Sequence, residues 1–257
     1  MLRYNGRCFL TDLEGSFVTD REIENSHMPS ADGGKAPVEL VVFDFDGTSI
    51  NGNSPVILVR RLVRQRRLKV SVIARIALWG AAYKLRLPQS ESWVRGLVFR
   101  AYAGMPKREV DERLRKFYDE AIAGRFRDQA DATMRSHRAQ GRVVLVVSAT
   151  FEPIVERAQE HHPFDFQIST RMEVDEEGNY TCRVAGEPVE GEEKPRAIER
   201  FANERFGEGN WTIAYAYGDH HSDRPMLGMA KTAVAVNPDR PLKRTARREG
   251  WQIVDWE

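Results

Sequence analysis

The stretch Val38-Glu39-Leu40-Val41-Val42-Phe43-Asp44-Phe45-Asp46-Gly47-Thr48 decides the fold of this chain. Its apolar, β-branched run up to Phe43 is typical of a parallel strand that is covered on both faces of a sheet. Asp44 and Asp46 follow this strand directly, and Gly47 lets the backbone turn sharply after them. Open α/β sheets bind their ligands at the carboxyl ends of the strands. The stretch therefore predicts a buried strand with a site at its end, although Asp and Gly are also ordinary turn residues.

The two carboxylates predict a cation. Neighbouring negative charges repel each other unless a cation or a shared proton relieves them. Asp44 and Asp46 are two residues apart, so on an extended strand both side chains would point to the same face. Mg²⁺ binds to one or two carboxylates together with the phosphate oxygens of a substrate. We therefore expect Mg²⁺ as the cofactor.

Further apolar runs alternate with helical patterns along the chain. Strands are expected at 143–147, 166–169, 211–217 and 232–236, and a hairpin at 172–174 and 180–184. Helices are expected at 127–140, from 153 onward, at 194–206 and in the basic C-terminal segment. Unbroken strands that alternate with helices predict an α/β fold with a doubly wound parallel sheet.

The chain of 257 residues is long enough for one α/β core with a second, smaller part. Residues 1–36 show weak periodicity and end in a Pro/Ser/Gly-rich sequence, so we expect an N-terminal extension outside the fold. Residues 51–124 show helical periods throughout and are expected to form an all-helical cap. The α/β core is then made by 37–50 and 125–257.

The net charge of +1 hides an uneven distribution. Residues 55–108 contain thirteen Lys or Arg and a single acid, Glu91, so this segment carries +12 and the rest of the chain −11. Such asymmetry indicates the kind of partner rather than the fold. Residues 70–87 are apolar with basic residues around them. They predict either a cap helix packed against its neighbours or a helix docked on an anionic membrane surface.

The chain shows no targeting or membrane-spanning segment. Its first thirty residues carry acids throughout and no continuous apolar stretch, so no signal peptide is visible. The run 70–83 is interrupted by Arg75 and is too short to span a bilayer. We expect a cytoplasmic protein, peripheral at the inner membrane face if the cap docks on lipid. The five tryptophans are too scattered for a stacking platform, so no nucleic-acid partner is expected.

Polar residues follow the ends of three predicted strands: Asp44 and Asp46, Ser148 and Thr150, and Asp219 and Asp223. A parallel sheet brings these strand ends to one edge, and Lys194, at the start of a helix, can reach the same edge. Carboxylates, a hydroxyl and an ammonium suit a metal-bound phosphoryl group. The metal and Lys194 neutralise its charge, while the hydroxyl and backbone N–H groups hold its oxygens.

Four motifs resemble those of the haloacid dehalogenase (HAD) superfamily: Asp44-Phe45-Asp46-Gly47-Thr48, Ser148-Ala149-Thr150, Lys194 and Gly218-Asp219-His220-His221-Ser222-Asp223. One such motif is a weak signal, whereas four in order at element boundaries are specific. The helical insertion is similar to the cap of the phosphoserine phosphatase-like branch, subfamily IB. The resemblance implies a phosphomonoester hydrolase that forms an aspartyl-phosphate and acts on a small phosphorylated metabolite or a lipid phosphate.

The resemblance also implies catalytic roles. Asp44 would be the nucleophile. Asp46 would protonate the leaving group and then deprotonate the hydrolytic water. Ser148 would donate a hydrogen bond to the phosphoryl group, and Lys194 would neutralise it.

The metal ligands implied by the resemblance are Asp44, the backbone carbonyl of Asp46, and Asp219, with Asp223 supporting the metal's waters or orienting Lys194. Substrate contacts are expected from Gly47, Thr48 and Ala149 within the motifs, and from Arg100 or Arg95 in the cap segment.

The substrate is less well determined than the reaction. Phosphoserine phosphatases are similar to one another in a Glu about nine residues after the nucleophile. Here that position is near Asn53, and no acid occurs from Ile50 to Gln89, so a substrate ammonium has no obvious partner. Alternatives are a phosphatidylglycerophosphate-type lipid phosphatase, a phosphotransferase, and a non-catalytic protein that binds an anionic surface. We expect His220 and His221 to line their loop rather than to bind a second metal.

Overall fold

The structure, a computed structural model, describes residues 36–65 and 98–257. Residues 36–257 form one compact unit. The predicted extension up to residue 35, the apolar segment 70–87 with its basic residues, and Arg95 lie outside the described residues.

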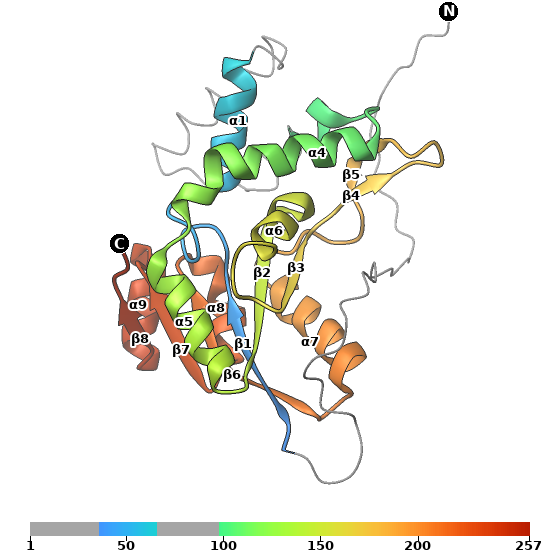
Figure 1. Ribbon diagram of the computed structural model, residues 1–257. Coiled ribbons are helices and arrows are strands. Elements are labelled where there is room, and N and C mark those ends of the chain that lie inside the picture. The colour runs from blue at the N-terminus through green and yellow to red at the C-terminus, as the bar shows by residue number, and fades with distance from the viewer. Residues whose placement is uncertain (1–35, 66–97) are drawn as a thin grey trace, which may run out of the picture. The chain divides into compact units, whose positions relative to one another are not determined.

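Six parallel strands form the main sheet in the order β3-β2-β1-β6-β7-β8 (Figure 1). They are β1 (Val38–Phe43), β2 (Val143–Phe151), β3 (Phe166–Thr170), β6 (Trp211–Gly218), β7 (Thr232–Val236) and β8 (Gln252–Val254). The chain adds strands first on one side of β1 and then on the other, so the strand order reverses beside β1. Ligands of such sheets bind at the carboxyl ends of the strands next to this reversal. The predicted doubly wound parallel sheet is confirmed.

Alternate residues of β1 face opposite sides of the sheet. Val41 and Phe43 belong to a first buried cluster, whereas Leu40 and Val42 belong to a second, and all four are fully buried. Because both faces are covered, the strand needs an apolar side chain at every one of these positions.

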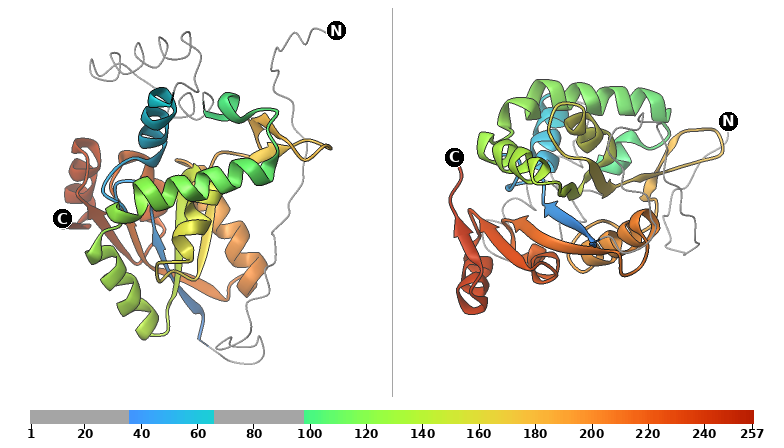
Figure 2. Two further views of the ribbon diagram at one scale, coloured as in Figure 1. Left: turned by 45° about the horizontal axis from the view of Figure 1, so that its top comes forward. Right: turned by 60° about the horizontal axis from the view of Figure 1, so that its bottom comes forward.

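Helices cover both faces (Figure 2). The first cluster is covered by α5 (Asp128–Ala139) and α6 (Glu152–Gln159). The second is covered by α7 (Glu193–Phe206), α8 (Arg224–Gly228) and α9 (Arg240–Glu249). The predicted helices appear within a few residues of their expected bounds. By contrast, α8 and β8 were not predicted, because each is too short to show a clear period.

Helical segments follow β1, as predicted. They comprise α1 (Ser54–Arg64), a helical stretch at 98–102, α4 (Lys107–Phe117), a π-helical turn (Tyr118–Ile122) and a 3₁₀ turn (Ala123–Arg125). In Figure 1 the arrowhead of β1 points toward α1 and α4. Leu58 of α1 and Leu114 of α4 join Phe45 in the first buried cluster. These helices therefore pack near the carboxyl end of β1, and their action as a closing cap stays a prediction.

The predicted hairpin is confirmed. β4 (Met172–Val174) pairs antiparallel with β5 (Tyr180–Val184) in a separate two-stranded sheet. The Tyr180 hydroxyl donates a hydrogen bond to Asp111 of α4 over 2.5 Å. The hairpin therefore supports the helical segment from one side.

His137 of α5 lies buried against the sheet. Its Nε2 is 2.9 Å from the Tyr217 hydroxyl and its Nδ1 is 3.1 Å from Arg142. Burial, and then the Arg142 guanidinium, lower the pKa of His137 below its usual value of 6.5. The unfolded chain therefore takes up a proton at this histidine at a higher pH than the folded protein does.

We expect the free energy of unfolding to decrease as the pH falls below about 6.5, because protonation of His137 favours the unfolded state. In His137→Gln this decrease should be smaller. Urea unfolding of both proteins between pH 8 and about pH 5 measures the difference. The pKa of His162 is also lowered by burial, but His162 is present in both proteins, so its contribution cancels. Parallel pH profiles of the two proteins would contradict the assignment.

Candidate active site

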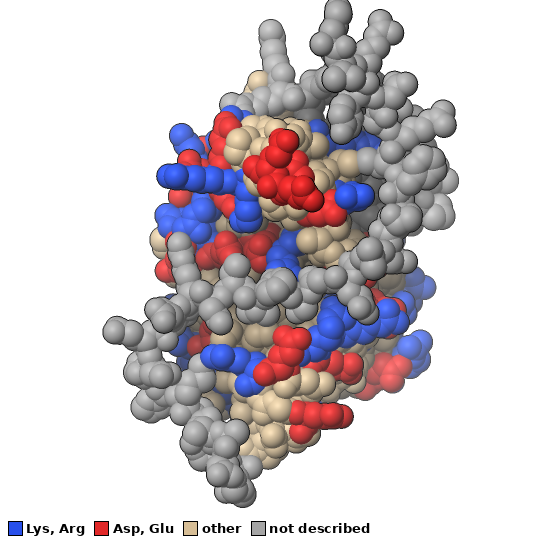
Figure 3. All heavy atoms as spheres, turned by 90° about the vertical axis from the view of Figure 1, so that its right-hand side faces the viewer, with Lys and Arg blue, Asp and Glu red and all other residues tan. Residues whose placement is uncertain are grey.

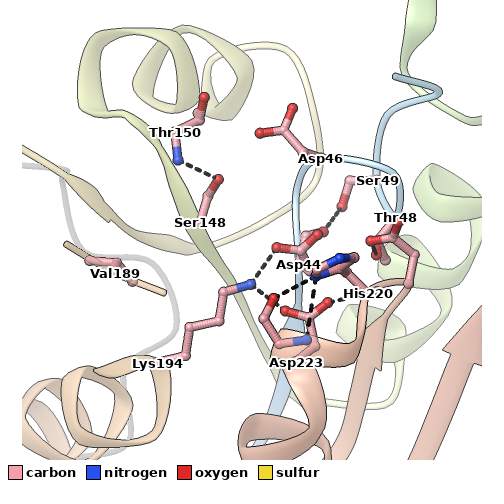
Figure 4. A network of polar contacts seen from close by, with 12 residues as sticks. Asp44, Asp46, Thr48, Ser49, Ser148, Thr150, Val189, Lys194, His220 and Asp223 are labelled. Carbon is pink, nitrogen blue, oxygen red and sulfur yellow. Dashed lines mark hydrogen bonds and ion pairs between the residues drawn. The ribbon is translucent and has the colours of Figure 1, made fainter. Parts of the chain in front are cut away.

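The predicted strand ends meet around one lysine. The Lys194 Nζ lies 2.5 Å from Asp44 Oδ1 and 2.7 Å from Asp223 Oδ1 (Figure 4). One carboxylate oxygen from each of Asp44, Asp219 and Asp223 lies within 4.8 Å of the other two. Asp44 follows β1, Asp219 follows β6, Asp223 closes the 3₁₀ turn after it, and Lys194 lies in the first turn of α7. We call these four residues the carboxylate cluster.

The carboxylate cluster is buried and carries excess negative charge. Asp44, Lys194 and Asp223 are 6%, 3% and 1% exposed. Burial raises the pKa of Asp44 well above its usual range, against the opposing effect of Lys194. Burial, followed by the charge of Asp223, raises the pKa of Asp219 to about 7. Burial alone would lower the pKa of Lys194, but the two carboxylates raise it overall, so the ammonium stays charged.

This set of donors fits a hard divalent cation. Three carboxylates face one ammonium, and a second cation would relieve the remaining repulsion. Oxygen ligands of this kind suit Mg²⁺, which takes one or more carboxylates and keeps other positions for water or phosphate. The residues present therefore fit the Mg²⁺ that was expected from the sequence.

The Asp46 carboxylate lies outside the carboxylate cluster. Its Oδ1 accepts a hydrogen bond from the backbone N–H of Ser54, at the start of α1 (2.5 Å), and its Oδ2 accepts one from the Ser54 hydroxyl (3.1 Å). The N-terminus of a helix favours a carboxylate. Since β1 ends at Phe43, as expected, strand alternation does not extend to Asp46, and the loop sets the direction of its side chain. Figure 4 shows Asp46 apart from Lys194, on the side of Thr150.

The loop after β1 packs closely against Asp219. Gly47 has φ +84°, and a Cβ there would lie 2.1 Å from Asp219 Oδ2. The Thr48 hydroxyl donates a hydrogen bond to Asp219 Oδ1 over 3.2 Å. A glycine is therefore required at position 47 both for the backbone conformation and for the space that the carboxylate occupies.

The remaining predicted site residues are Ser148, Ala149 and Arg100. Ser148 is fully buried, and its Oγ accepts a hydrogen bond from the Thr150 N–H over 3.0 Å. Ala149 follows it in β2 and is half-buried. Arg100 is exposed on the stretch 98–102. Substrate contacts of Ala149 and Arg100 stay predictions.

Three residues that the sequence did not single out support the site. The Ser49 hydroxyl donates a hydrogen bond to the Asp44 carbonyl over 2.6 Å. Ser54 donates two hydrogen bonds to Asp46, as described above. The Ser54-Pro55 pair, which predicts a helix start, was the sequence pattern that could have pointed to this residue. Arg127 is buried and donates to the Gly47 carbonyl over 3.3 Å. An arginine at a helix start carries no signal of this contact in the sequence.

A parallel sheet with buried aspartates and a lysine at its switch point is typical of an α/β enzyme that binds its ligand there. A family profile described as haloacid dehalogenase-like hydrolase matches residues 41–228 of this chain. The chain therefore belongs to this family.

Two relatives and one solved structure to which this chain is similar support the same assignment. The chain is 29% identical over 227 residues to the phosphoserine phosphatase SerB1 of Mycobacterium tuberculosis, covering 86% of this chain and 72% of that protein. It is 30% identical over 248 residues to a probable phosphatase of the same organism, covering 93% and 83%. A solved structure of a Bordetella pertussis protein with unknown function shares the fold, with TM-score 0.75, 24% identity, and coverage of 86% and 99%. The predicted HAD-superfamily phosphatase is confirmed.

The substitution Gly47→Ala should abolish phosphatase activity, because the new methyl group and the Asp219 carboxylate cannot occupy the same space. The matched control is Gly178→Ala in the hairpin. Gly178 has φ +82°, with no atom within 4 Å of an added Cβ. Both variants bear the left-handed backbone cost of about 1–2 kcal/mol. Thermal unfolding should therefore show this loss in both variants, with a further loss in Gly47→Ala because the methyl group displaces the Asp219 carboxylate. Hydrolysis of p-nitrophenyl phosphate should be retained in Gly178→Ala. Equal activity of the two variants would contradict this account of Gly47.

Proposed function

We propose that this HAD-family phosphatase is a Mg²⁺-dependent phosphomonoesterase that works through an aspartyl-phosphate on Asp44 and acts on small phosphate esters. The observation that carries the proposal is the buried contact of Lys194 with both Asp44 and Asp223. This contact supports a nucleophilic carboxylate beside a fixed positive charge, which attack on an anionic phosphoryl group requires.

Asp44 forms the covalent intermediate. One of its carboxylate oxygens contacts Lys194, and the other attacks phosphorus. The bond from phosphorus to the ester oxygen breaks as the new bond from Asp44 forms, and the electron pair leaves with the alcohol oxygen. The Lys194 ammonium stabilises charge on the phosphoryl oxygens during this transfer.

Asp46 acts as the general acid in the first half of the reaction and as the general base in the second. It donates a proton to the departing alcohol oxygen and later accepts one from the water that attacks the aspartyl-phosphate. That second attack releases inorganic phosphate and restores the Asp44 carboxylate. The hydrogen bonds from Ser54 hold the Asp46 side chain beside the carboxylate cluster without making it a part of the cluster.

Asp44, Asp219 and Asp223 are the side chains that would hold Mg²⁺, together with the carbonyl of Asp46. When bound, the ion offsets the negative charge that phosphate and carboxylate bring together. Thr48 and Gly47 support this arrangement because they fix the position of Asp219.

The relative named phosphoserine phosphatase makes phosphoserine the first substrate to test. Asn53, near the position where the resemblance expects a Glu, instead caps α1 by accepting a hydrogen bond from the Val56 N–H over 3.0 Å. A comparison of phosphoserine with phospholactate, which lacks the ammonium, measures whether that group is recognised. Equal kcat/KM for the two esters would exclude recognition of the ammonium.

The lipid alternative finds no support in the described residues. None of their helices is long and apolar enough to cross a membrane. In the described part of the basic segment, Arg61, Lys107 and Arg108 form ion pairs with Glu120, Asp111 and Glu112. On the face shown in Figure 3, acidic and basic side chains are interspersed. Such a surface attracts an anionic bilayer less than a purely cationic one does.

Asp44→Asn should reduce hydrolysis of p-nitrophenyl phosphate by at least about 10³-fold, because the amide is a poor nucleophile. Asp46→Asn should reduce it by about 10²- to 10⁴-fold through loss of proton transfer. Asp175→Asn is the matched control, since Asp175 is an exposed carboxylate of the hairpin turn that asparagine can replace as an acceptor. Turnover by Asp44→Asn at the rate of the wild type would overturn the proposed mechanism.

Removal of metal ions by a chelator should abolish activity, and addition of Mg²⁺ should restore it. Mg²⁺ at 100 times its Kd should also stabilise the wild type by about 2.7 kcal/mol, because it binds the folded state. The stabilisation should be absent in Asp219→Asn, which removes one carboxylate of the cluster. Differential scanning calorimetry with and without Mg²⁺ provides the measurement. An identical Mg²⁺ response in both proteins would place the ion elsewhere.

A further inference from the structure

We propose that His220, His221 and Asp239 form a second metal site that takes a tetrahedral transition-metal ion of the Zn²⁺ type. The two histidines follow β6, and Asp239 is the N-cap of α9 after β7. The sequence showed two histidines without a third ligand. The structure supplies the third ligand from a residue eighteen positions further along the chain.

The spacing of the three donor atoms matches a tetrahedral ion. His220 Nε2 and His221 Nδ1 are 3.1 Å apart, and these atoms lie 3.5 Å and 3.3 Å from Asp239 Oδ2. Bonds of about 2.0–2.1 Å from Zn²⁺ to nitrogen or oxygen place tetrahedral ligands about 3.3–3.4 Å from one another. The three atoms are therefore arranged as one face of such a tetrahedron.

Hydrogen bonds within the trio account for at most two of its three close contacts. Asp239 Oδ2 accepts only, and each imidazole nitrogen either donates or accepts. Each of the three atoms is therefore either a donor or an acceptor, so at least two of them are of the same kind. The close contact between those two cannot be a hydrogen bond. A cation at the centre would satisfy all three lone pairs at once.

Hydrogen bonds with neighbouring groups hold the His220 and Asp239 side chains in place. His220 Nδ1 lies 2.9 Å from the Ser222 hydroxyl and 3.4 Å from the Ser222 N–H. In the tautomer that binds a metal through Nε2, Nδ1 donates its proton to this hydroxyl. Asp239 Oδ1 accepts a hydrogen bond from the Leu242 N–H over 2.7 Å, which directs Oδ2 toward the histidines. Histidine and carboxylate ligands of metals are commonly held in this way.

The donor atoms select a different ion from that of the carboxylate cluster. Two imidazole nitrogens and one carboxylate oxygen suit Zn²⁺, whereas Mg²⁺ prefers oxygen ligands alone. The side chains of His220, His221 and Asp239 are 37%, 46% and 29% exposed, so solvent reaches the trio. Three protein ligands leave the fourth position of a tetrahedral ion for water or an anion.

An ion at this site would act on the loop that carries Asp219 and Asp223 of the carboxylate cluster. The Asp239 N–H donates a hydrogen bond to the Asp219 carbonyl over 2.9 Å. The His220 N–H donates one to Asp223 Oδ2 over 3.1 Å. Occupation of the trio would therefore restrain the segment between Asp219 and Asp223. We expect thermal unfolding to move to higher temperature when the ion is present.

The test uses the full chain without a histidine tag, freed of metal and then saturated with Mg²⁺. Titration with Co²⁺, whose tetrahedral complexes absorb strongly in the visible range, should show one site, and Zn²⁺ should displace the Co²⁺. His221→Ala and Asp239→Asn should each weaken Zn²⁺ binding by about tenfold or more. Asparagine keeps the N-cap of α9, so Asp239→Asn tests the ligand without loss of the helix start. His161→Ala, a histidine outside the trio, is the matched control.

Asp44→Asn separates this site from the proposed active site. It should abolish hydrolysis and leave the Co²⁺ spectrum intact. Loss of the spectrum in Asp44→Asn, or wild-type binding in both His221→Ala and Asp239→Asn, would place the ion in the carboxylate cluster and overturn the inference. A wild type without tetrahedral Co²⁺ absorption would also overturn it. Circular dichroism checks that each variant is folded, and His220→Gln provides a further ligand substitution.

Discussion

The buried ammonium of Lys194, held between Asp44 and Asp223, is the interaction on which the rest of the site depends. An uncompensated charge inside a protein costs several kcal/mol, so three neighbouring carboxylates need a fixed positive partner. Lysine offsets one of these charges and leaves an excess. Burial, together with that excess, raises the pKa of Asp219, and a cation beside the cluster would lower the local energy.

The sheet brings this lysine and the carboxylates together. β1 has β2 on one side and β6 on the other. Asp44 and Asp219, which follow β1 and β6, therefore lie at the same edge as Ser148 in the last part of β2, which continues to Phe151 and not to residue 147 as expected. Gly47 packs directly against the Asp219 carboxylate, so the loop after β1 and the loop after β6 are in contact. Family membership and the named relatives agree with a phosphatase.

Much of this arrangement could be predicted from local patterns. The buried strand before Asp44, the hairpin and the positions of Lys194 and Asp219 follow from apolar runs, turn residues and the topology of parallel sheets. The direction of Asp46 could not be predicted, since it depends on a hydrogen bond with Ser54, which in turn contacts Thr150, ninety-six residues away. The contact of Arg127 with Gly47 and the approach of Asp239 to the histidines likewise arise from tertiary packing alone. β8 has three residues, too few for a pattern.

The central position of β1 has a consequence for biosynthesis. β1 lies early in the chain, yet its neighbour β6 and the partner of Asp44 come late: Lys194 is 150 residues beyond Asp44, and Asp219 is 171 beyond Thr48. A nascent chain leaving the ribosome therefore carries a strand with two apolar faces and an unneutralised aspartate for most of its synthesis. Contacts of such long range close late and slow folding, so the newly made protein passes through a period when an apolar strand lacks its β6 neighbour.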